Sequence, residues 1–405
     1  MLQALIAAVS GLDVHQQWMD LIGNDIANVD TIGFKSQNMD FASLFAQTTS
    51  QGNAPTATSG GTNPIQIGLG ATVGSVSTDE SNGALQETNI ATNVALQGSG
   101  MFVLNNGSGG DVYTRMGDFS TDSSGYLVEG TSGDRVEGWM ATNGVLPQEN
   151  SSTLQDITLP NTQVLPPQAT SSVTYSGNLD VAATSSVTAP ITVYDSLGNT
   201  WTLNFTFSPS GTSDVWNWQA TVPAGAGGGT FNGTITFKSN GTFQSMTGGP
   251  ITMNPTGAAA QTITPNFSAV TQLNETTSVS GSNQNGTSAG TLSSLSVSNT
   301  GVITGSFSNG QTQTLAQVAV ASFANPQGLV QTGDGVYSVG NNSGLAQIGV
   351  AGVGGRGTMD SGYLEGSNVN LALELTEMMD AERGFQANTQ VVTTVLQMLQ
   401  SLSTL

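Results

Sequence analysis

Residues 371–400 read LALELTEMMDAERGFQANTQVVTTVLQMLQ, and their apolar side chains recur at alternating steps of four and three residues. The repeat runs through nine positions, which are Leu371, Leu375, Met378, Glu382, Phe385, Thr389, Val392, Leu396 and Leu399. An apolar repeat of this period is typical of a long helix that packs against another helix along one seam. A helix of roughly 35 residues is about 50 Å long, which is too long for a small β-domain to cover. We therefore expect helical partners for this segment.

The start of the chain predicts the first of these partners. Apolar residues recur at helical spacing from Leu2 to Val29, and no proline occurs before Pro55, so we expect an amphipathic helix over residues 2–29. Two paired helices alone would leave part of each apolar stripe in water, which favours burial against further copies of the chain. The side chains expected at these subunit interfaces are Leu5, Val9, Leu12, Met19, Ile26, Leu371, Leu375, Met378, Phe385, Val392, Leu396 and Leu399.

Composition excludes several classes of function. The 405 residues include 6 Lys and Arg against 27 Asp and Glu, for a formal net charge of −21, so we expect no nucleic-acid partner. The chain has no cysteine and a single histidine, His15, and we therefore expect no catalytic, cofactor or metal site. The apolar runs are shorter than the roughly 20 residues of a membrane span, so we expect no span, and we also expect no cleavable signal peptide.

Between the two ends the pattern changes to alternation of apolar and polar residues, with turns rich in Gly, Asn and Asp. This pattern predicts antiparallel strands and hairpins. The fold class that we expect is therefore α+β, mainly β, with two nested antiparallel β-domains and paired N- and C-terminal coiled-coil helices. We expect a terminal helical coiled-coil domain at residues 1–30 plus 366–405 and a linker at residues 31–70. We expect a core β-domain at residues 71–150 plus 318–365 and an inserted outer β-domain at residues 151–317.

Aromatic residues in the middle of the chain have two interpretations. Trp201, Trp216 and Trp218 have the chemistry of a sugar-stacking platform, which a glycan-binding module would use. However, Trp216 and Trp218 are two residues apart and share one face of a strand, so we favour the core of the inserted domain. A polar loop is expected over residues 274–289, which read NETTSVSGSNQNGTSA.

Three stretches near the ends carry distinctive motifs, namely Asn24-Asp-Ile-Ala-Asn28, Thr31-Ile-Gly-Phe-Lys35 and Gly362-Tyr-Leu-Glu-Gly-Ser-Asn-Val369. They resemble the signature segments of the bacterial flagellar axial proteins, which include rod and hook subunits. That family usually has Asn where Asp25 stands in this chain. The residues that match its motifs are Asn24, Ile26, Ala27, Asn28, Gly33, Phe34, Glu365, Ser367 and Asn368.

Segments of the middle are similar to hook proteins within this family, in particular Val193-Tyr-Asp-Ser-Leu-Gly-Asn199 and Phe323-Ala-Asn-Pro-Gln-Gly-Leu329. The resemblance implies a structural subunit, not an enzyme, that polymerises into a flexible hollow tube joining rod to filament and transmitting torque. It implies an extracellular place in the flagellum after export without a cleavable signal. The partners that it implies are other copies of the chain, the distal rod protein, the hook cap protein, the hook–filament junction protein and the flagellar type III export apparatus.

Two alternatives remain open from the sequence alone. A distal rod subunit would share the terminal motifs but lack most of residues 160–315. An extracellular β-sandwich adhesin or glycan-binding module would account for the β-rich middle but would have no use for two long terminal helices.

Overall fold

The computed structural model describes residues 2–56, 58–107, 109–147, 154–159, 164–333 and 335–403. The chain forms two compact units, each described below by itself. Unit 1 contains residues 1–160, 295–304 and 314–405, and unit 2 contains residues 161–294 and 305–313. The domain boundary expected at residues 150–151 lies outside the described residues. The chain passes between the units within β23 (Gly290–Val297), β24 (Val302–Phe307) and β25 (Thr312–Val318).

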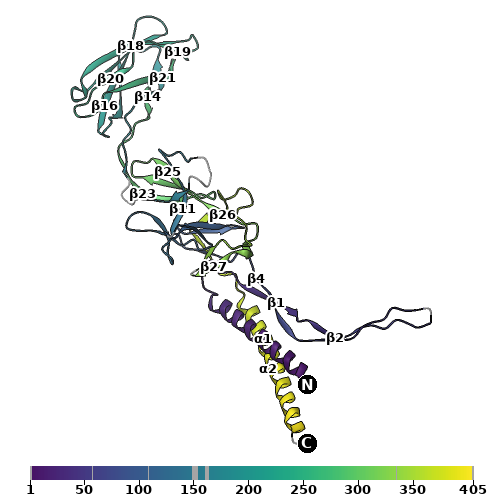
Figure 1. The fold of residues 1–405 in the computed structure, drawn as a ribbon. Helices are drawn as coiled ribbons and strands as arrows, with labels where there is room; N and C mark the ends of the chain where they lie inside the picture. Colours follow the sequence, from purple (N-terminus) through teal and green to yellow (C-terminus); the bar gives the residue numbers. More distant parts are fainter. Residues whose placement is uncertain are drawn as a thin grey trace. The chain divides into compact units, whose positions relative to one another are not determined.

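Both predicted terminal helices are present in unit 1. Helix α1 spans Leu2–Ala27 and helix α2 spans Leu371–Ser403, and they pack side by side (Figure 1). Their contacts are antiparallel, because Gly11 lies against Asn388 and the ring of His15 lies against Gly384. A Cβ atom at Gly11 would come within 2.7 Å of the Asn388 side chain, so glycine permits this close approach. No helix in the described part of the chain is long and apolar enough to cross a membrane.

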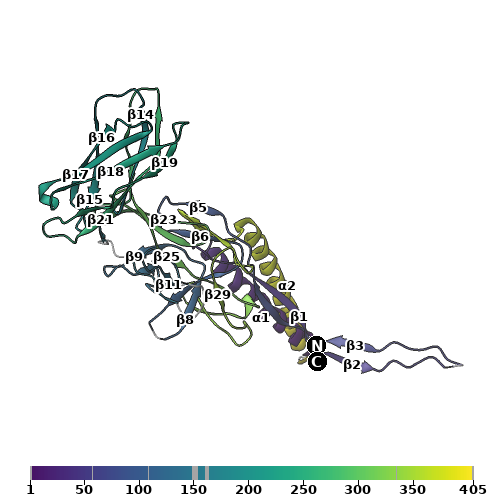
Figure 2. The ribbon, with the colours of Figure 1, turned by 90° about the horizontal axis from the view of Figure 1, so that it is seen from above.

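The stretch 31–70, expected as a linker, contains β-structure. Strand β1 (Gln37–Ser43) pairs with β4 (Ala71–Thr78), and Phe41 on β1 packs edge-on against Trp18 of α1 at 5.3 Å between ring centroids. Beyond them, β2 (Ala46–Ser50) and β3 (Ile65–Gly68) pair with each other and form a two-stranded arm (Figure 2). Every residue of β2 and β3 is exposed, so the arm contributes no core to the subunit.

The rest of unit 1 is a β-domain whose central strands β11, β7, β8, β28 and β27 pair in that order, all antiparallel. Its core contains Trp139 and Val103, both 0% exposed, and the edge-on ring pair of Tyr113 and Phe323. The bounds are β5 Leu85–Glu87, β6 Val94–Gln97, β7 Met101–Asn105, β8 Asp111–Thr114, β9 Phe119–Thr121, β10 Leu127–Glu129, β11 Arg135–Met140, β12 Gln155–Asp156, β26 Val320–Ser322, β27 Val330–Gly333, β28 Val336–Ser338, β29 Gln347–Gly349, β30 Thr358–Ser361 and β31 Tyr363–Glu365.

Unit 2 contains a five-stranded antiparallel sheet in the order β15–β16–β17–β18–β19 and a four-stranded sheet in the order β20–β21–β14–β22. Strands β14 and β21 are parallel, which departs from the all-antiparallel expectation. A parallel pair needs a long crossover, and here the whole five-stranded sheet lies between the two strands in sequence. The bounds are β13 Val164–Leu165, β14 Ser172–Asp180, β15 Val187–Tyr194, β16 Thr200–Pro209, β17 Val215–Val222, β18 Gly229–Phe237, β19 Phe243–Met246, β20 Ile251–Met253, β21 Gln261–Leu273 and β22 Ser280–Gln284.

The core of unit 2 is aromatic. Trp216 and Trp218 are buried, which confirms the prediction that they belong to the core rather than to an exposed platform. Tyr175 packs against Phe205 at 4.7 Å between ring centroids. The prediction of a polar loop over residues 274–289 was wrong in part, because strand β22 lies within this stretch and pairs with β14. Its alternating small polar residues hide the strand, since neither of its faces is strongly apolar.

Candidate functional site

The family-motif residue Glu365 forms the centre of a buried ionic cluster in unit 1. Its carboxylate Oε1 lies 2.6 Å from Lys35 Nζ, and Oε2 lies 3.2 Å from Arg115 Nη2. The side chains of Lys35, Arg115 and Glu365 are only 3%, 4% and 0% exposed. Three charged groups removed from water cost much free energy unless other hydrogen bonds satisfy them.

The backbone around the cluster supplies several of those hydrogen bonds, although Glu365 Oε2 and Arg115 Nε have no hydrogen-bond partner among the described residues. Lys35 Nζ also donates to the carbonyl oxygen of Ser81 at 2.6 Å, and the amide of Gly83 donates to Glu365 Oε1 at 3.0 Å. Burial lowers the pKa of Lys35, and its hydrogen bond to Glu365 opposes that change. In this cluster the two cations, Lys35 and Arg115, therefore pair with the single carboxylate of Glu365.

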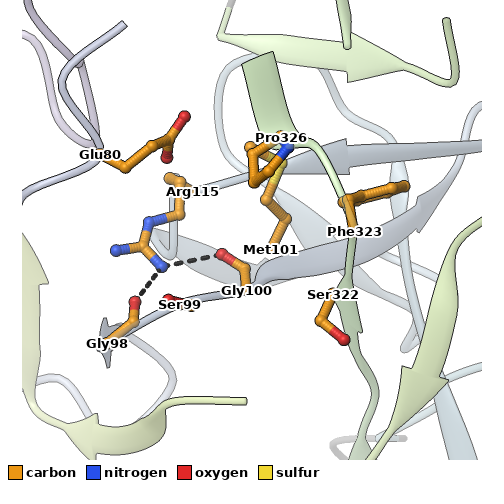
Figure 3. A pocket seen from close by; sticks show the side chains of 9 residues that line it. All are labelled: Glu80, Gly98, Ser99, Gly100, Met101, Arg115, Ser322, Phe323 and Pro326. Carbon is orange, nitrogen blue, oxygen red and sulfur yellow. Dashed lines mark hydrogen bonds between the residues drawn. The ribbon is translucent and has the colours of Figure 1, made fainter. Parts of the chain in front are cut away.

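Arg115 connects the ionic cluster to the β-domain. Its Nη1 donates at 2.8 Å to the carbonyl oxygens of both Gly98 and Gly100, as Figure 3 shows. Beside the guanidinium is a cavity of about 60 Å³, lined also by Glu80 and Phe323. That volume is far below the several hundred cubic ångströms of a typical small-molecule site. We therefore assign the cavity to the packing around Arg115 and not to a cofactor.

Asn368, another motif residue, joins the same segments through its amide group. Its Oδ1 accepts the amide of Ser36 at 2.8 Å, and its Nδ2 donates at 2.8 Å to the carbonyl oxygen of Asp79. The amide of Gly33 donates to the Glu365 carbonyl oxygen at 2.7 Å. Gly33 has a φ of +67°, and a Cβ there would lie 3.0 Å from the backbone of Arg115. A side chain at this position is therefore disfavoured both by conformation and by space.

The remaining motif residues lie beside this junction. Asn28 Nδ2 donates to the Asn24 carbonyl oxygen at 2.9 Å near the end of α1, and Thr31 Oγ1 donates to Asn28 Oδ1 at 3.0 Å. Asn24, Asn28, Gly33 and Phe34 line one side of a groove of about 410 Å³. Ile26 is half-buried and Ala27 is exposed, while Ser367 is half-buried and donates no hydrogen bond to the ionic cluster among those described. The motif residues therefore gather where the helices join the β-domain.

The expected subunit-interface residues divide into two sets on the helix pair. The half-buried set contains Leu5, Leu12, Met19, Ile26, Met378, Phe385 and Val392. The exposed set contains Val9 at 52%, Leu371 at 44%, Leu375 at 47%, Leu396 at 53% and Leu399 at 38%.

The buried residues of α2 are Glu374, Ala381 and Val395. Each lies one position before a member of the nine-position apolar repeat that runs from Leu371 to Leu399. Small residues at 381 and 384 let α1 approach this neighbouring stripe. The side chains of Leu375, Leu396 and Leu399 are consequently left uncovered on the subunit.

Sequence reasoning missed two members of the site, Lys35 and Arg115. A signal was present, because only six basic residues occur in the chain and these two stand inside motif-like segments. Within the described residues, no group of three His, Asp or Glu side chains is arranged to hold a metal ion.

Comparison with known proteins gives consistent matches. Family models match for the flagellar hook protein FlgE/F/G D1 domain at residues 95–181, the flagellar basal body protein FlaE D2 domain at 165–287 and the flagellar basal body rod FlgEFG protein C-terminal region at 360–405. The chain is 35% identical to flagellar hook protein FlgE of Borreliella burgdorferi, with 99% of each chain covered. It is 36% identical to the Treponema pallidum protein of the same name, with 100% of each covered.

A solved structure shows a similar fold. The crystal structure of Helicobacter pylori flagellar hook protein FlgE2 matches with a TM-score of 0.51 and 15% sequence identity. The match covers 69% of this chain and 100% of that one. At this identity the likeness concerns the fold alone.

Proposed function

The chain belongs to the flagellar hook protein family and is a structural subunit of the hook, and we propose that it assembles into a flexible hollow tube through the uncovered faces of α1 and α2. The observation that carries the proposal is the apolar stripe on α2. Leu375 is 47% exposed and Leu396 is 53% exposed, and Leu2 on α1 is 70% exposed. Burial is worth about 25 cal/mol per Å² of apolar surface, so contact with other copies stabilises these helices.

The two-stranded arm offers a second assembly surface. Phe45 is 89% exposed at the start of the arm, and Ile65 and Ile67 on β3 are 59% and 45% exposed. Large exposed apolar side chains next to β2 and on β3, in an element without a core, are typical of a segment that packs against another molecule. We propose that residues 31–70 connect the helices to the β-domain and also contact neighbouring subunits.

Bending of the tube is proposed to come from the β-domains. Unit 2 contains only five charged residues, which are Asp180, Asp195, Asp214, Lys238 and Glu275. The exposed face of its five-stranded sheet is uncharged and contains Thr188, Thr192, Thr202, Asn204, Asn217, Gln219, Thr221 and Asn232. Neutral polar surfaces form few ion pairs that would fix one register, so such surfaces are suited to sliding past one another.

Membership of the family supports further proposals about location and partners. We propose an extracellular position between the distal rod and the filament, reached by the flagellar type III export apparatus without a cleavable signal. The proposed contacts at the ends of the tube are the distal rod protein, the hook cap protein and the hook–filament junction protein. The subunit would transmit torque along this axis and carry out no enzymatic reaction.

Electron microscopy of the purified protein, salted out in the presence of short hook fragments as seeds, tests the proposal. Curved tubes are expected from the wild-type chain, and no tubes are expected from a variant that lacks residues 371–403. Straight tubes would favour the rod alternative. A folded chain that forms no tubes would favour the adhesin alternative instead.

A further inference from the structure

The chain contains seven Asn-Gly pairs, and the structure sets one of them apart from the rest. The pairs begin at Asn82, Asn106, Asn143, Asn232, Asn240, Asn285 and Asn309. Glycine has no side chain to shield its backbone nitrogen, so this nitrogen can reach the side-chain carbonyl carbon of a preceding asparagine. The reaction requires a glycine amide that is free of hydrogen bonds and an asparagine side chain that is free to turn towards it.

The pair Asn143–Gly144 meets both requirements. It forms the two-residue loop of a hairpin, in which Thr142 and Val145 exchange backbone hydrogen bonds of 2.9 and 3.1 Å. Asn143 and Gly144 have φ values of 53° and 79°, as expected for an Asn-Gly hairpin turn. Asn143 is exposed, and within the described ranges neither its side chain nor the Gly144 amide forms a hydrogen bond.

The six other glycines are held in place. Gly233 lies within β18 and pairs with Trp218 of β17, so the strand must leave its ladder before Asn232 can react. The other five glycine amides each donate a hydrogen bond. Their acceptors are Glu365 Oε1 for Gly83 at 3.0 Å, Asn105 Oδ1 for Gly107 at 2.9 Å, the Lys238 carbonyl oxygen for Gly241 at 2.8 Å, Gln284 Oε1 for Gly286 at 2.6 Å and the Phe307 carbonyl oxygen for Gly310 at 2.9 Å.

Asn240 is a close match to Asn143 in local sequence. Residues 239–242 read SNGT and residues 142–145 read TNGV, and both asparagines are exposed. However, Asn240 Oδ1 accepts the Thr242 amide at 3.2 Å and the Thr242 hydroxyl group at 2.7 Å. The two pairs therefore differ mainly in the hydrogen bonds that restrain them.

We infer that Asn143 is a site of spontaneous deamidation in the folded chain and that it reacts faster than the six other pairs. The Gly144 nitrogen forms a bond to Asn143 Cγ and loses its proton to the solvent. The bond from Cγ to Nδ2 breaks, and the side-chain amide leaves as ammonia. Water then opens the resulting five-membered imide at either carbonyl carbon, which gives aspartate or isoaspartate at position 143.

Both products change the hairpin beyond the end of β11. Each places a negative charge where Asn143 is neutral. Isoaspartate also lengthens the main chain of the loop, so Thr142 and Val145 can no longer keep both of their hydrogen bonds. The next bond along the chain, from the Ala141 amide to the Leu315 carbonyl oxygen at 2.8 Å, then becomes the last of the hairpin. The inference concerns the folded chain alone, so it holds or fails independently of the proposed assembly.

Incubation of the full chain at pH 8.5 and 37 °C, with and without urea, tests the inference. Digestion with pepsin in acid followed by mass spectrometry would measure deamidation at each pair as a gain of about 1 Da. In the folded chain Asn143 should react about tenfold faster than Asn240 or more, because each hydrogen bond that must open lowers the reactive population several-fold. In urea the two rates should agree within about twofold, since the restraints are gone.

Three outcomes would overturn the inference. The first is equal rates at Asn143 and Asn240 in the folded chain, and the second is an Asn143 that reacts only in urea. The third is a tenfold difference that persists in urea, because the cause would then be the sequence and not the structure.

Two variants provide matched controls. Asn143→Gln should abolish the mass gain in its peptide and leave the rate at Asn240 unchanged. Thr242→Val gives residues 239–242 the same last residue as the loop at 142–145 and removes the hydroxyl hydrogen bond to Asn240 Oδ1. The rate at Asn240 should then rise several-fold in the folded chain and stay unchanged in urea. An unchanged rate in the folded chain would contradict the role that we give to these hydrogen bonds.

Discussion

Replacing Glu365 by glutamine should destabilise unit 1 strongly. The change removes the carboxylate that neutralises Lys35 and Arg115, and both cations would remain in sites where they are only 3% and 4% exposed. Removing one partner of a buried ion pair costs about 3–5 kcal/mol, because the remaining charge stays uncompensated. Here two cations lose their partner, so we expect a loss of stability at the upper end of that range.

A matched control exists on the surface of the same unit. Arg135 Nη1 lies 2.9 Å from Asp156 Oδ2, but the Arg135 side chain is 46% exposed. An exposed pair contributes about 0–1 kcal/mol, so Arg135→Gln should have little effect. The two variants remove ion pairs of similar length that differ mainly in burial.

Scanning calorimetry of the full chain would measure the difference. Each kilocalorie per mole shifts the midpoint of a domain of this size by about 2–4 °C, so Glu365→Gln should lower the transition of unit 1 by roughly 10 °C or more. The transition of unit 2 is an internal reference, since Glu365 and its partners belong to unit 1. If Glu365→Gln and Arg135→Gln shifted the transition equally, our assignment of Glu365 as the centre of the junction would be wrong.

Three further changes test other parts of the structure. Leu399→Asp should abolish seeded polymerisation and leave the urea midpoint of the monomer unchanged, because Leu399 is 38% exposed; normal tubes would contradict the assembly surface. Gly33→Ala should cost about 1–3 kcal/mol in urea denaturation, since alanine would have to adopt a φ of +67°; wild-type stability would count against the strain argument. Burial and the charges of Asp111 and Asp156 raise the pKa of Glu137 to about 7 in the folded chain. Protonated Glu137 therefore contributes to the free energy of unfolding below pH 4.5, and about 3 kcal/mol of that free energy is lost as the pH rises to 7. Glu137→Gln should remove that part of the pH dependence of unfolding, and an unchanged profile would refute it.

The terminal helices were predictable because their signal is local. A run of 33 residues with a regular apolar repeat and no proline has few alternatives to a helix, and α2 spans Leu371–Ser403 as expected. The face that α2 turns to α1 was less predictable. Ala381 and Gly384 contribute little to the hydrophobic periodicity of the sequence. Their small side chains nevertheless decide which stripe of α2 the helix α1 can approach.

The arm and the ionic junction had weaker signals in the sequence. Strands β2 and β3 are exposed on both faces, so no apolar alternation marks them within a polar stretch. Lys35 and Glu365 are 330 positions apart, and no local pattern indicates which of 27 acidic residues meets a given base. The motif resemblance identified Glu365 and Asn368 as important, but only the structure shows what they hold together.

The junction has a mechanical consequence. A single chain segment between two bodies acts as a swivel, because rotation about its backbone bonds lets one body turn without the other. Here two segments cross from the helices to the β-domain, one after α1 and one before α2, and Gly33, Ser36 and Lys35 bond them to each other through Glu365 and Asn368. Twisting the helix pair must therefore twist the β-domain with it, and a pull along the helices loads several of these bonds at once rather than one after another.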